Sequence, residues 1–341
     1  MRALLDETQQ EFQGVAREIA QSLAIQNPSD LDGRSSGWPT LASAGLLELR
    51  ERTDDEPTAG GVEVALLLLE LGAALVPDPF LPSAIVAGDL LARAGAPADV
   101  QSGLGSGETL LGILLTDDLT AFGSPDGADA IVWGGGGDAG GILAVRPTDQ
   151  GAELVLGRSD GAVALDAISL TNTLWRAPSI SWEAVGSLSH EDLDRSLALA
   201  LTGLSADTVG SLDAALRGVV EYSKQRIAYG VHIGSFQAIQ HLAADALVAI
   251  AGVRAATLYA AWAIDELDAD EALLAARTAK AAAARMGQRT GEDVMQIYGG
   301  IGQTWEHIAH FHTRRAIFDA AVLGGEDHQL DAIADARLGG N

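Results

Sequence analysis

Long segments rich in alanine and leucine run from about residue 190 nearly to the end of the chain. Leucines and a valine cover one broad face of a helix in Asp194–Lys224, and Leu247–Trp262 and Glu271–Arg289 have the same texture. Helices that are apolar around most of their circumference are buried on several sides, and alanine lets helices approach closely. These segments therefore predict a helical bundle, part of whose surface is an oligomer interface.

The first part of the chain, residues 1–108, is also predicted to be helical. Apolar residues recur there at spacings of three and four, as an amphipathic helix requires. The segments with this spacing are Leu4–Leu23, Trp38–Leu47, Val62–Leu75 and Ala84–Ala94. Pro77, Pro79 and Pro82 mark a turn between two of them, and Gly95 with Pro97 ends the last.

Residues 109–189 have a different texture, which is typical of β-strands. Short apolar runs, among them Leu110–Leu115, Ile142–Val145 and Ile180–Val185, alternate with clusters of Gly, Asp, Ser and Pro. This spacing predicts a small antiparallel barrel or sandwich. The glycines of 134–137 favour a flexible hairpin turn over a phosphate loop, because no GK[ST] sequence and no long helix follow them. The expected fold is α+β, with domains at 1–108, 109–189 and 190–341.

Composition and net charge exclude several classes of function. The chain has 341 residues, 48% of them hydrophobic, and a formal net charge of −26, which argues against wrapping nucleic acid or an anionic membrane surface. It contains no cysteine, which excludes disulfides, thiolate metal sites and a cysteine nucleophile. No run reaches the ~18–20 uncharged residues of a membrane span, so a soluble cytoplasmic protein is expected.

Two stretches of the last third carry more polar and glycine residues than packing requires. Tyr222–His241 leaves a helix at Arg226, turns at Gly230 and enters a new helix near Ser235. Gln296–His307 has three glycines in four positions, which end a helix and expose backbone N–H groups to a phosphate or ribose. Arg226 could instead only complement a helix dipole, and the glycines could only cap a helix. Their combination favours one anionic, planar, hydrogen-bonding ligand.

These stretches resemble the acyl-CoA dehydrogenase family. The family pattern R-x-x-F-G-x-x-I-x-x-F-Q-x-x-Q-H is matched from Arg226 to His241, with Tyr229 replacing the first Phe, and Q-x-x-G-G-x-G is matched from Gln296 to Gly302. The sequence of Thr304–His307 is similar to one branch of the family. The resemblance covers the whole chain in order and implies an N-terminal helical domain, a middle β-barrel or sandwich domain and a C-terminal four-helix bundle.

The resemblance also implies a reaction and a cofactor. In this family FAD oxidises an acyl-CoA thioester to the enoyl-CoA, while a carboxylate removes the α-proton. By the family pattern, Arg226 and Gln237 would contact the pyrophosphate and adenosine part of FAD, and residues 296–300 would line the same dinucleotide from a neighbouring subunit; no metal is implied. These cofactor-binding candidates are Arg226, Tyr229, Phe236, Gln237, Gln296, Ile297, Gly299 and Gly300.

The chain departs from the family where the catalytic base is expected. Counting along the family pattern places Leu323 at the usual glutamate, and the alternative position early in the bundle is Ala200. Neither side chain can accept a proton, so no catalytic residue is assigned; Glu306 is the fallback for a relocated base. The stretches beside the flavin ring are also replaced, by Val132–Gly135 and by the segments 116–118 and 123–125.

The resulting hypothesis is a smaller, base-lacking subunit of a heteromeric acyl-CoA dehydrogenase, with an α2β2 assembly. Its partner would be a paralogous catalytic chain, its substrate an acyl-CoA, and an electron-transfer protein would accept the electrons. The similarity to actinobacterial enzymes that shorten sterol side chains suggests a steroid-CoA thioester. Two alternatives stay open: a self-sufficient homomeric enzyme with a relocated base, and a non-redox scaffold that binds acyl-CoA.

Overall fold

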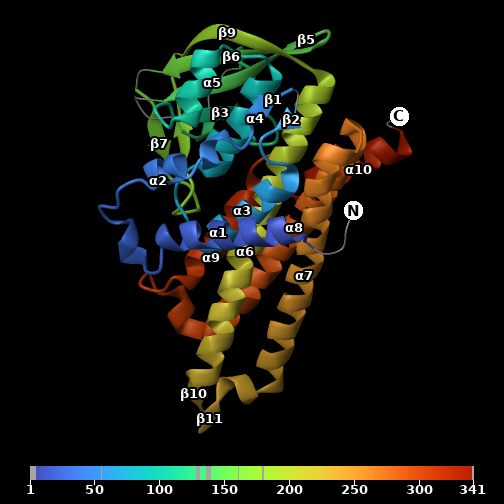
Figure 1. Ribbon diagram of the computed structural model, residues 1–341. Helices are drawn as coiled ribbons and strands as arrows, with labels where there is room; N and C mark the ends of the chain where they lie inside the picture. Colours follow the sequence, from blue (N-terminus) through green and yellow to red (C-terminus); the bar gives the residue numbers. More distant parts are fainter. Residues whose placement is uncertain are drawn as a thin grey trace.

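The computed structural model describes residues 5–54, 56–127, 131–135, 140–159, 161–178 and 180–339. It contains an N-terminal group of helices, a β-sheet and a long helical bundle, in that chain order (Figure 1). The sheet lies at one end of the molecule, beside the first turns of the bundle, and the far end of the bundle projects away from it. The α+β architecture predicted from the sequence is confirmed.

The N-terminal region is built from short helices around one strongly apolar helix. Its elements are α1 (Glu7–Ser22), α2 (Trp38–Ser43), α3 (Gly61–Ala73), a π-helical segment (Leu81–Val86), α4 (Ala87–Arg93) and α5 (Ala98–Gly105), with a hairpin of β1 (Arg52–Thr53) and β2 (Glu56–Pro57). Asp6 caps α1, since its carboxylate accepts from the backbone N–H of Gln9 at 2.9 Å. Asp265 of the later bundle accepts from the N–H of Gly61, which ties the start of α3 to that bundle.

The middle region forms one sheet, which has seven strands among the described residues, in the order β7-β8-β4-β3-β5-β6-β9. The strands are β3 (Leu111–Leu115), β4 (Ile131–Gly134), β5 (Gly141–Thr148), β6 (Gly151–Ser159), β7 (Val163–Leu165), β8 (Leu174–Arg176) and β9 (Ile180–Ser189). β3 and β5 pair in parallel, so the sheet is mixed rather than wholly antiparallel. A parallel pair needs a crossover, and the hairpin containing β4 supplies it. The predicted turn at 134–137 lies partly outside the described residues.

The C-terminal region is the predicted bundle. It contains α6 (His190–Gln225), α7 (Gln237–Glu266), α8 (Ala269–Tyr298), α9 (Ala309–Ala321) and α10 (Glu326–Leu338). A small hairpin of β10 (Ile227–Ala228) and β11 (Val231–His232) joins α6 to α7. Ser189 starts α6 with a capping box shared with Asp192. α6 and α8 run in the same direction, and α7, which lies between them in the sequence, runs in the opposite direction. The C-terminal ends of α6 and α8, which carry the two motifs, therefore both lie at the far end of the bundle (Figure 1).

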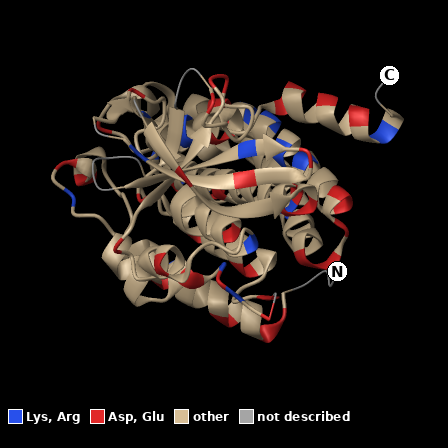
Figure 2. Ribbon diagram, turned by 90° about the horizontal axis from the view of Figure 1, so that it is seen from above, with Lys and Arg blue, Asp and Glu red and all other residues tan. Residues whose placement is uncertain are grey.

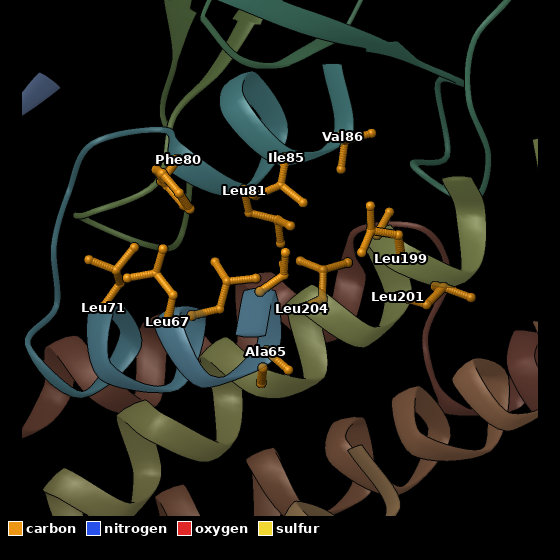
Figure 3. Packing of buried hydrophobic residues seen from close by; sticks show 14 of the residues in the cluster. Ala65, Leu67, Leu71, Phe80, Leu81, Ile85, Val86, Leu199, Leu201 and Leu204 are labelled. Carbon is orange, nitrogen blue, oxygen red and sulfur yellow. The ribbon is translucent and has the colours of Figure 1, made fainter. Parts of the chain in front are cut away.

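The core sits where the N-terminal region meets α6. Figure 3 shows side chains of α3, the π-helical segment and α6 pointing toward one another, among them Leu67, Leu81 and Leu204. Two glycines bring α3 and α6 together: a Cβ on Gly210 would lie 1.9 Å from the carbonyl oxygen of Leu69, and one on Gly72 would lie 2.4 Å from that of Asp207. The α3–α6 contact is therefore a backbone-to-backbone contact that only glycine permits.

The charge and the apolar surface of the bundle are unevenly distributed. Carboxylates lie along most of the helices, and the basic residues are fewer (Figure 2). Among the described residues, α7 alone is long and apolar enough to cross a membrane, by length and composition. It packs along α6 and α8, yet only 39% of its most apolar stretch is buried. Such a helix in a bundle has a face that this chain leaves uncovered.

Candidate cofactor-binding site

The two sequence motifs meet at the far end of the bundle. The rings of Tyr222, near the end of α6, and Tyr298, the last residue of α8, lie 5.1 Å apart at an angle of 45°. His307 packs edge-on against Tyr298, with ring centroids 4.4 Å apart. Burial raises the pKa of Tyr298 and lowers that of His307, so both rings are neutral at pH 7. These aromatic contacts join segments that are 76 residues apart in the sequence, from 222 to 298.

Arg226 is placed by the end of α6 and the hairpin that follows. Its N–H donates to the carbonyl of Tyr222 at 2.9 Å, and its own carbonyl accepts from the N–H of Ile233 at 2.9 Å. Tyr229 and Gly230 both have positive φ, +55° and +82°, as a tight two-residue hairpin turn requires. The sequence expectation that the chain turns at Gly230 is confirmed. Ser235 is not the N-cap of α7, because Phe236 holds that position and the Ser235 hydroxyl donates to His232.

The glycine turn after α8 presents open backbone. Gly299 ends the helix with a φ of +65°, and no heavy atom lies within 4 Å of a Cβ built on Gly299 or Gly300. A ligand can approach this backbone to a distance that side chains elsewhere prevent. Gln296, one turn earlier, is exposed, as are Gln237 and Arg226. Ile297 differs from the other candidates, since its side chain is buried in the core and supports the turn from below.

Large apolar side chains are exposed around these residues. Tyr229 is 99% exposed and Trp305 is 61% exposed, which is far more than single aromatic residues on a soluble surface usually show. We call this surface the tip patch; it consists of Ile227, Tyr229, Val231, Phe236, Ile301 and Trp305. Exposed apolar side chains that gather at one end of a molecule are typical of a contact with another molecule.

The histidines after the glycine turn have separate partners. His307 packs edge-on against Tyr298, His310 lies against Trp305 and Phe311, and His312 shares a hydrogen bond of 2.9 Å with the hydroxyl of Ser211. No group of three or more metal-ligating side chains is found within the described part of the chain. Glu306, the fallback base, is exposed, and the nearby arginines bind elsewhere: Arg314 donates to the carbonyl of Ile168 and Arg315 to Asp207.

The two positions that the resemblance assigns to the catalytic base are buried and apolar. Leu323 is 1% exposed and Ala200 is fully buried, and both belong to the main core. The turn that carries Leu323 is fixed from below, because the ammonium of Lys280 donates to the carbonyls of Ala320 and Gly324 at 2.9 and 3.1 Å. The amide of Gln329 donates to the carbonyl of Leu323. Burial lowers the pKa of Lys280 to about 7.

A buried ionic cluster occupies the region one helical turn before Leu323. Arg315 forms a two-pronged ion pair with Asp207 of α6, with distances of 2.6 and 2.7 Å. Asp319 accepts from the hydroxyl of Thr208 at 3.2 Å, and burial together with the nearby Asp207 raises the pKa of Asp319 well above its usual value. The burial of Arg315 could not be predicted from the sequence, because an arginine on a predicted helix is usually solvated.

Little space remains beside this cluster. A cavity of about 30 Å³, room for one water molecule, is lined by Trp133 and Gly134 of β4, by Phe80 and by Arg315 and Asp319. Gly134 packs directly on the π-helical segment, since a Cβ there would lie 2.5 Å from Cγ of Pro82. The resemblance places the family's flavin-side stretch at Val132–Gly135.

Comparisons with known proteins agree with the geometry. Residues 195–338 match the family model "Acyl-CoA dehydrogenase, C-terminal domain". Acyl-CoA dehydrogenase IpdE2 of Mycobacterium tuberculosis is 33% identical over 267 residues, which cover 78% of this chain and 75% of the relative. Acyl-CoA dehydrogenase FadE34 of the same organism is 28% identical over 89% of this chain, but the match spans only 42% of FadE34.

Solved structures show the same fold. A variant of the Tcur3481-Tcur3483 steroid ACAD has a TM-score of 0.80 and 26% identity, with 97% of both chains covered. The ChsE4-ChsE5 complex from Mycobacterium tuberculosis has a TM-score of 0.80 at 23% identity over the whole of both chains. The fold and the two motifs are those of a flavin-dependent dehydrogenase. The chain belongs to the acyl-CoA dehydrogenase family, whose cofactor is FAD.

The residues at the bundle end fit one part of FAD. A guanidinium group, two exposed glutamine amides and an open glycine backbone match the donors that a diphosphate and an adenosine require. Beside β4, the described residues Gly134 and Pro82 are packed directly against each other.

Proposed function

We propose that this chain is a base-lacking subunit of a heteromeric acyl-CoA dehydrogenase and that it completes the FAD site of a catalytic partner chain. The proposal is based on the difference between the bundle end, which has the donors that FAD needs, and the positions of the catalytic base, which have no proton acceptor. Donors for the diphosphate and adenosine gather at the exposed bundle end, whereas both base positions are buried aliphatic residues. When bound, FAD supplies the two-electron acceptor for α,β-dehydrogenation of an acyl-CoA thioester.

In the proposed site each residue has a distinct task. Arg226 binds the diphosphate, because a guanidinium fork matches phosphate oxygens and its backbone is held by the hairpin. Gln237 and Gln296 donate to the adenosine side, and the open backbone of Gly299 and Gly300 lets the dinucleotide lie close to the turn. Tyr229 and Phe236, both exposed, shield this contact from water once a partner covers them.

The uncovered apolar surfaces support a paralogous partner. The tip patch belongs to the same two chain segments as the proposed FAD donors, so the surface that binds the dinucleotide would also contact the chain that holds the flavin ring. The outer face of α7 offers a second apolar surface, where Leu247 is 56% exposed and Val248 is 72% exposed. Two separate interfaces are what an α2β2 assembly needs. A solved structure with the same fold, the Tcur3481-Tcur3483 steroid ACAD, has a name that joins two protein designations.

The proposed substrate is a steroid side-chain CoA thioester, and the proposed location is the cytoplasm. The support for the steroid class is the similarity to that steroid ACAD, and the acyl-CoA class follows from the family. The electrons would pass to an electron-transfer protein, as is general for the family.

The first test is the visible absorption of bound flavin, near roughly 450 nm. The chain purified alone should be colourless, and the chain co-purified with a paralogous catalytic subunit should be yellow and active. A yellow, active lone chain would instead establish a self-sufficient enzyme, and Glu306→Gln would then test the fallback base. A complex that contains no flavin in any form would favour the non-redox scaffold.

The second test is an arginine substitution in the complex. Arg226→Ala should weaken FAD retention by about tenfold to a hundredfold, because it removes charged hydrogen bonds to the diphosphate. Arg337→Ala, an exposed arginine in the last turn of α10, is the matched control and should leave FAD retention unchanged. Unchanged retention in the Arg226 variant would contradict the proposed site.

A further inference from the structure

A polar cleft lies between the N-terminal helices and the bundle, away from the proposed FAD contacts. Its volume is about 420 Å³, and α1, α3, α6 and α7 form its walls (Figure 1). Three arginines from three different helices line it: Arg17, Arg217 and Arg254. We propose that this cleft binds a small anion that carries phosphate, such as a phosphomonoester or a diphosphate.

The arginines are held in place by two carboxylates. Arg17 donates through Nε and Nη2 to Glu70, at 3.1 and 3.0 Å, and Gln13 donates to the same carboxylate at 2.8 Å. Asp213 accepts from Nη1 of Arg217 at 2.5 Å and from Nη2 of Arg254 at 3.1 Å. Both carboxylates are largely buried, with 11% and 19% of their side chains exposed. The guanidinium groups are thus oriented before any ligand arrives.

Each guanidinium keeps donors for a ligand. No hydrogen bond among the described residues uses Nη1 of Arg17, Nε or Nη2 of Arg217, or Nε or Nη1 of Arg254. Three cations and two carboxylates give the cleft a net positive charge in a chain whose net charge is −26. A phosphate group has enough oxygens to accept from several arginine edges at once, and planar guanidinium groups recognise it through paired N–H donors.

The floor of the cleft is rigid. Gly210 and Leu69, both lining residues, are the pair at which α3 and α6 approach backbone to backbone. The spacing between Glu70 and Asp213 is therefore set by the tightest helix contact described above. Arg217 precedes Arg226 by nine residues, which is about 13 Å along α6, so this cleft and the bundle end are distinct sites.

The test uses calorimetric titration of the purified chain with inorganic phosphate, pyrophosphate and malonate at low salt. Saturable binding of phosphate or pyrophosphate, weaker for malonate, is expected. Arg254→Gln and Arg217→Gln should each weaken that binding by about tenfold, since each removes charged hydrogen bonds. Arg158→Gln, an exposed arginine on β6, is the control and should bind as the unmodified chain does.

Arg226→Gln separates the cleft from the proposed FAD site. If pyrophosphate binding survives in this variant and is lost in the Arg254 variant, the cleft is the binding site, whatever the fate of the FAD proposal. Loss of binding in the Arg226 variant alone would overturn the inference. If neither phosphate nor pyrophosphate binds, there is no anion site and the inference is wrong. If malonate binds equally well, the site has no preference for phosphate, and the inference is also wrong.

Discussion

The rings of Tyr222 and Tyr298 lie 5.1 Å apart and connect the last turn of α6 to the last residue of α8. Arg226 follows the first tyrosine by one helical turn, and Gly299 follows the second directly. This aromatic contact lies beside both the proposed diphosphate donor and the open glycine backbone. We expect it to help hold the two motifs in one site.

Substitution of Tyr298 by Ala tests that expectation. It should lower the free energy of unfolding by about 2 kcal/mol, less than a fully buried aromatic residue because the ring is half-buried. It should also weaken FAD retention in the complex, although the tyrosine is not itself a proposed donor. Urea unfolding and flavin absorbance measure the two effects. Tyr229→Ala, at a 99% exposed position, should leave stability unchanged, and an equal loss there would contradict the argument.

The close contact of α3 and α6 gives a second prediction. Gly210→Ala should destabilise the chain by about 2 kcal/mol or more, because its Cβ would lie 1.9 Å from a backbone oxygen that cannot move alone. Gly14→Ala, in the middle of α1 with open space around it, should stabilise by about 0.5–1 kcal/mol. Thermal melts of the two variants should shift in opposite directions; shifts of the same sign would mean that the helices separate easily.

Most of the fold and about half of the candidate site could be predicted from the sequence. Periodicity identified the helical regions and the apolar runs of most strands, because burial on one face leaves a pattern within each element. It could not identify the parallel pairing of β3 and β5, since pairing depends on contacts between distant segments. β8 was not predicted, because only two of its three residues, Leu174 and Trp175, are apolar.

The site residues show the same limit. Arg226 and Gly299 could be identified because each belongs to a motif of fixed spacing that is visible in the sequence. The structure brings the two motifs to one end of the bundle. The ion pair of Arg315 with Asp207 joins positions 108 residues apart, and each looks like an ordinary surface charge in its own helix. Likewise, Arg17 and Arg254 of the polar cleft come from α1 and α7, so no sequence window contains both.

The buried ion pair gives a third prediction. Arg315→Ala should destabilise by about 3–5 kcal/mol, because it leaves the Asp207 carboxylate without its partner in the core. Lys224→Ala removes an exposed pair with Glu221 and should change stability by less than about 1 kcal/mol. Chemical unfolding curves of the two variants make the comparison. A small effect in the Arg315 variant would mean that water reaches Asp207.

His312 gives a prediction for pH. Burial, and next the charge of Arg315, lower the pKa of His312 from 6.5 to about 3, and its Nδ1 is hydrogen-bonded to Ser211. Between about pH 6.5 and pH 3 the unfolded chain therefore binds a proton at this residue that the folded chain does not. Stability contributed by neutral His312 is fully present above pH 6.5 and is lost as pH falls, with a slope of up to about 1.4 kcal/mol per pH unit.

The variant His312→Asn keeps a hydrogen-bonding group near Ser211 but cannot take up this proton. Its free energy of unfolding, measured in urea from pH 6.5 to 4.5, should fall less steeply than that of the unmodified chain. The difference in slope, rather than the slope itself, is the test, because the many carboxylates titrate equally in both chains. His232→Asn, at an exposed residue of β11, should show the slope of the unmodified chain. Identical slopes for all three chains would mean that His312 takes up a proton inside the folded protein.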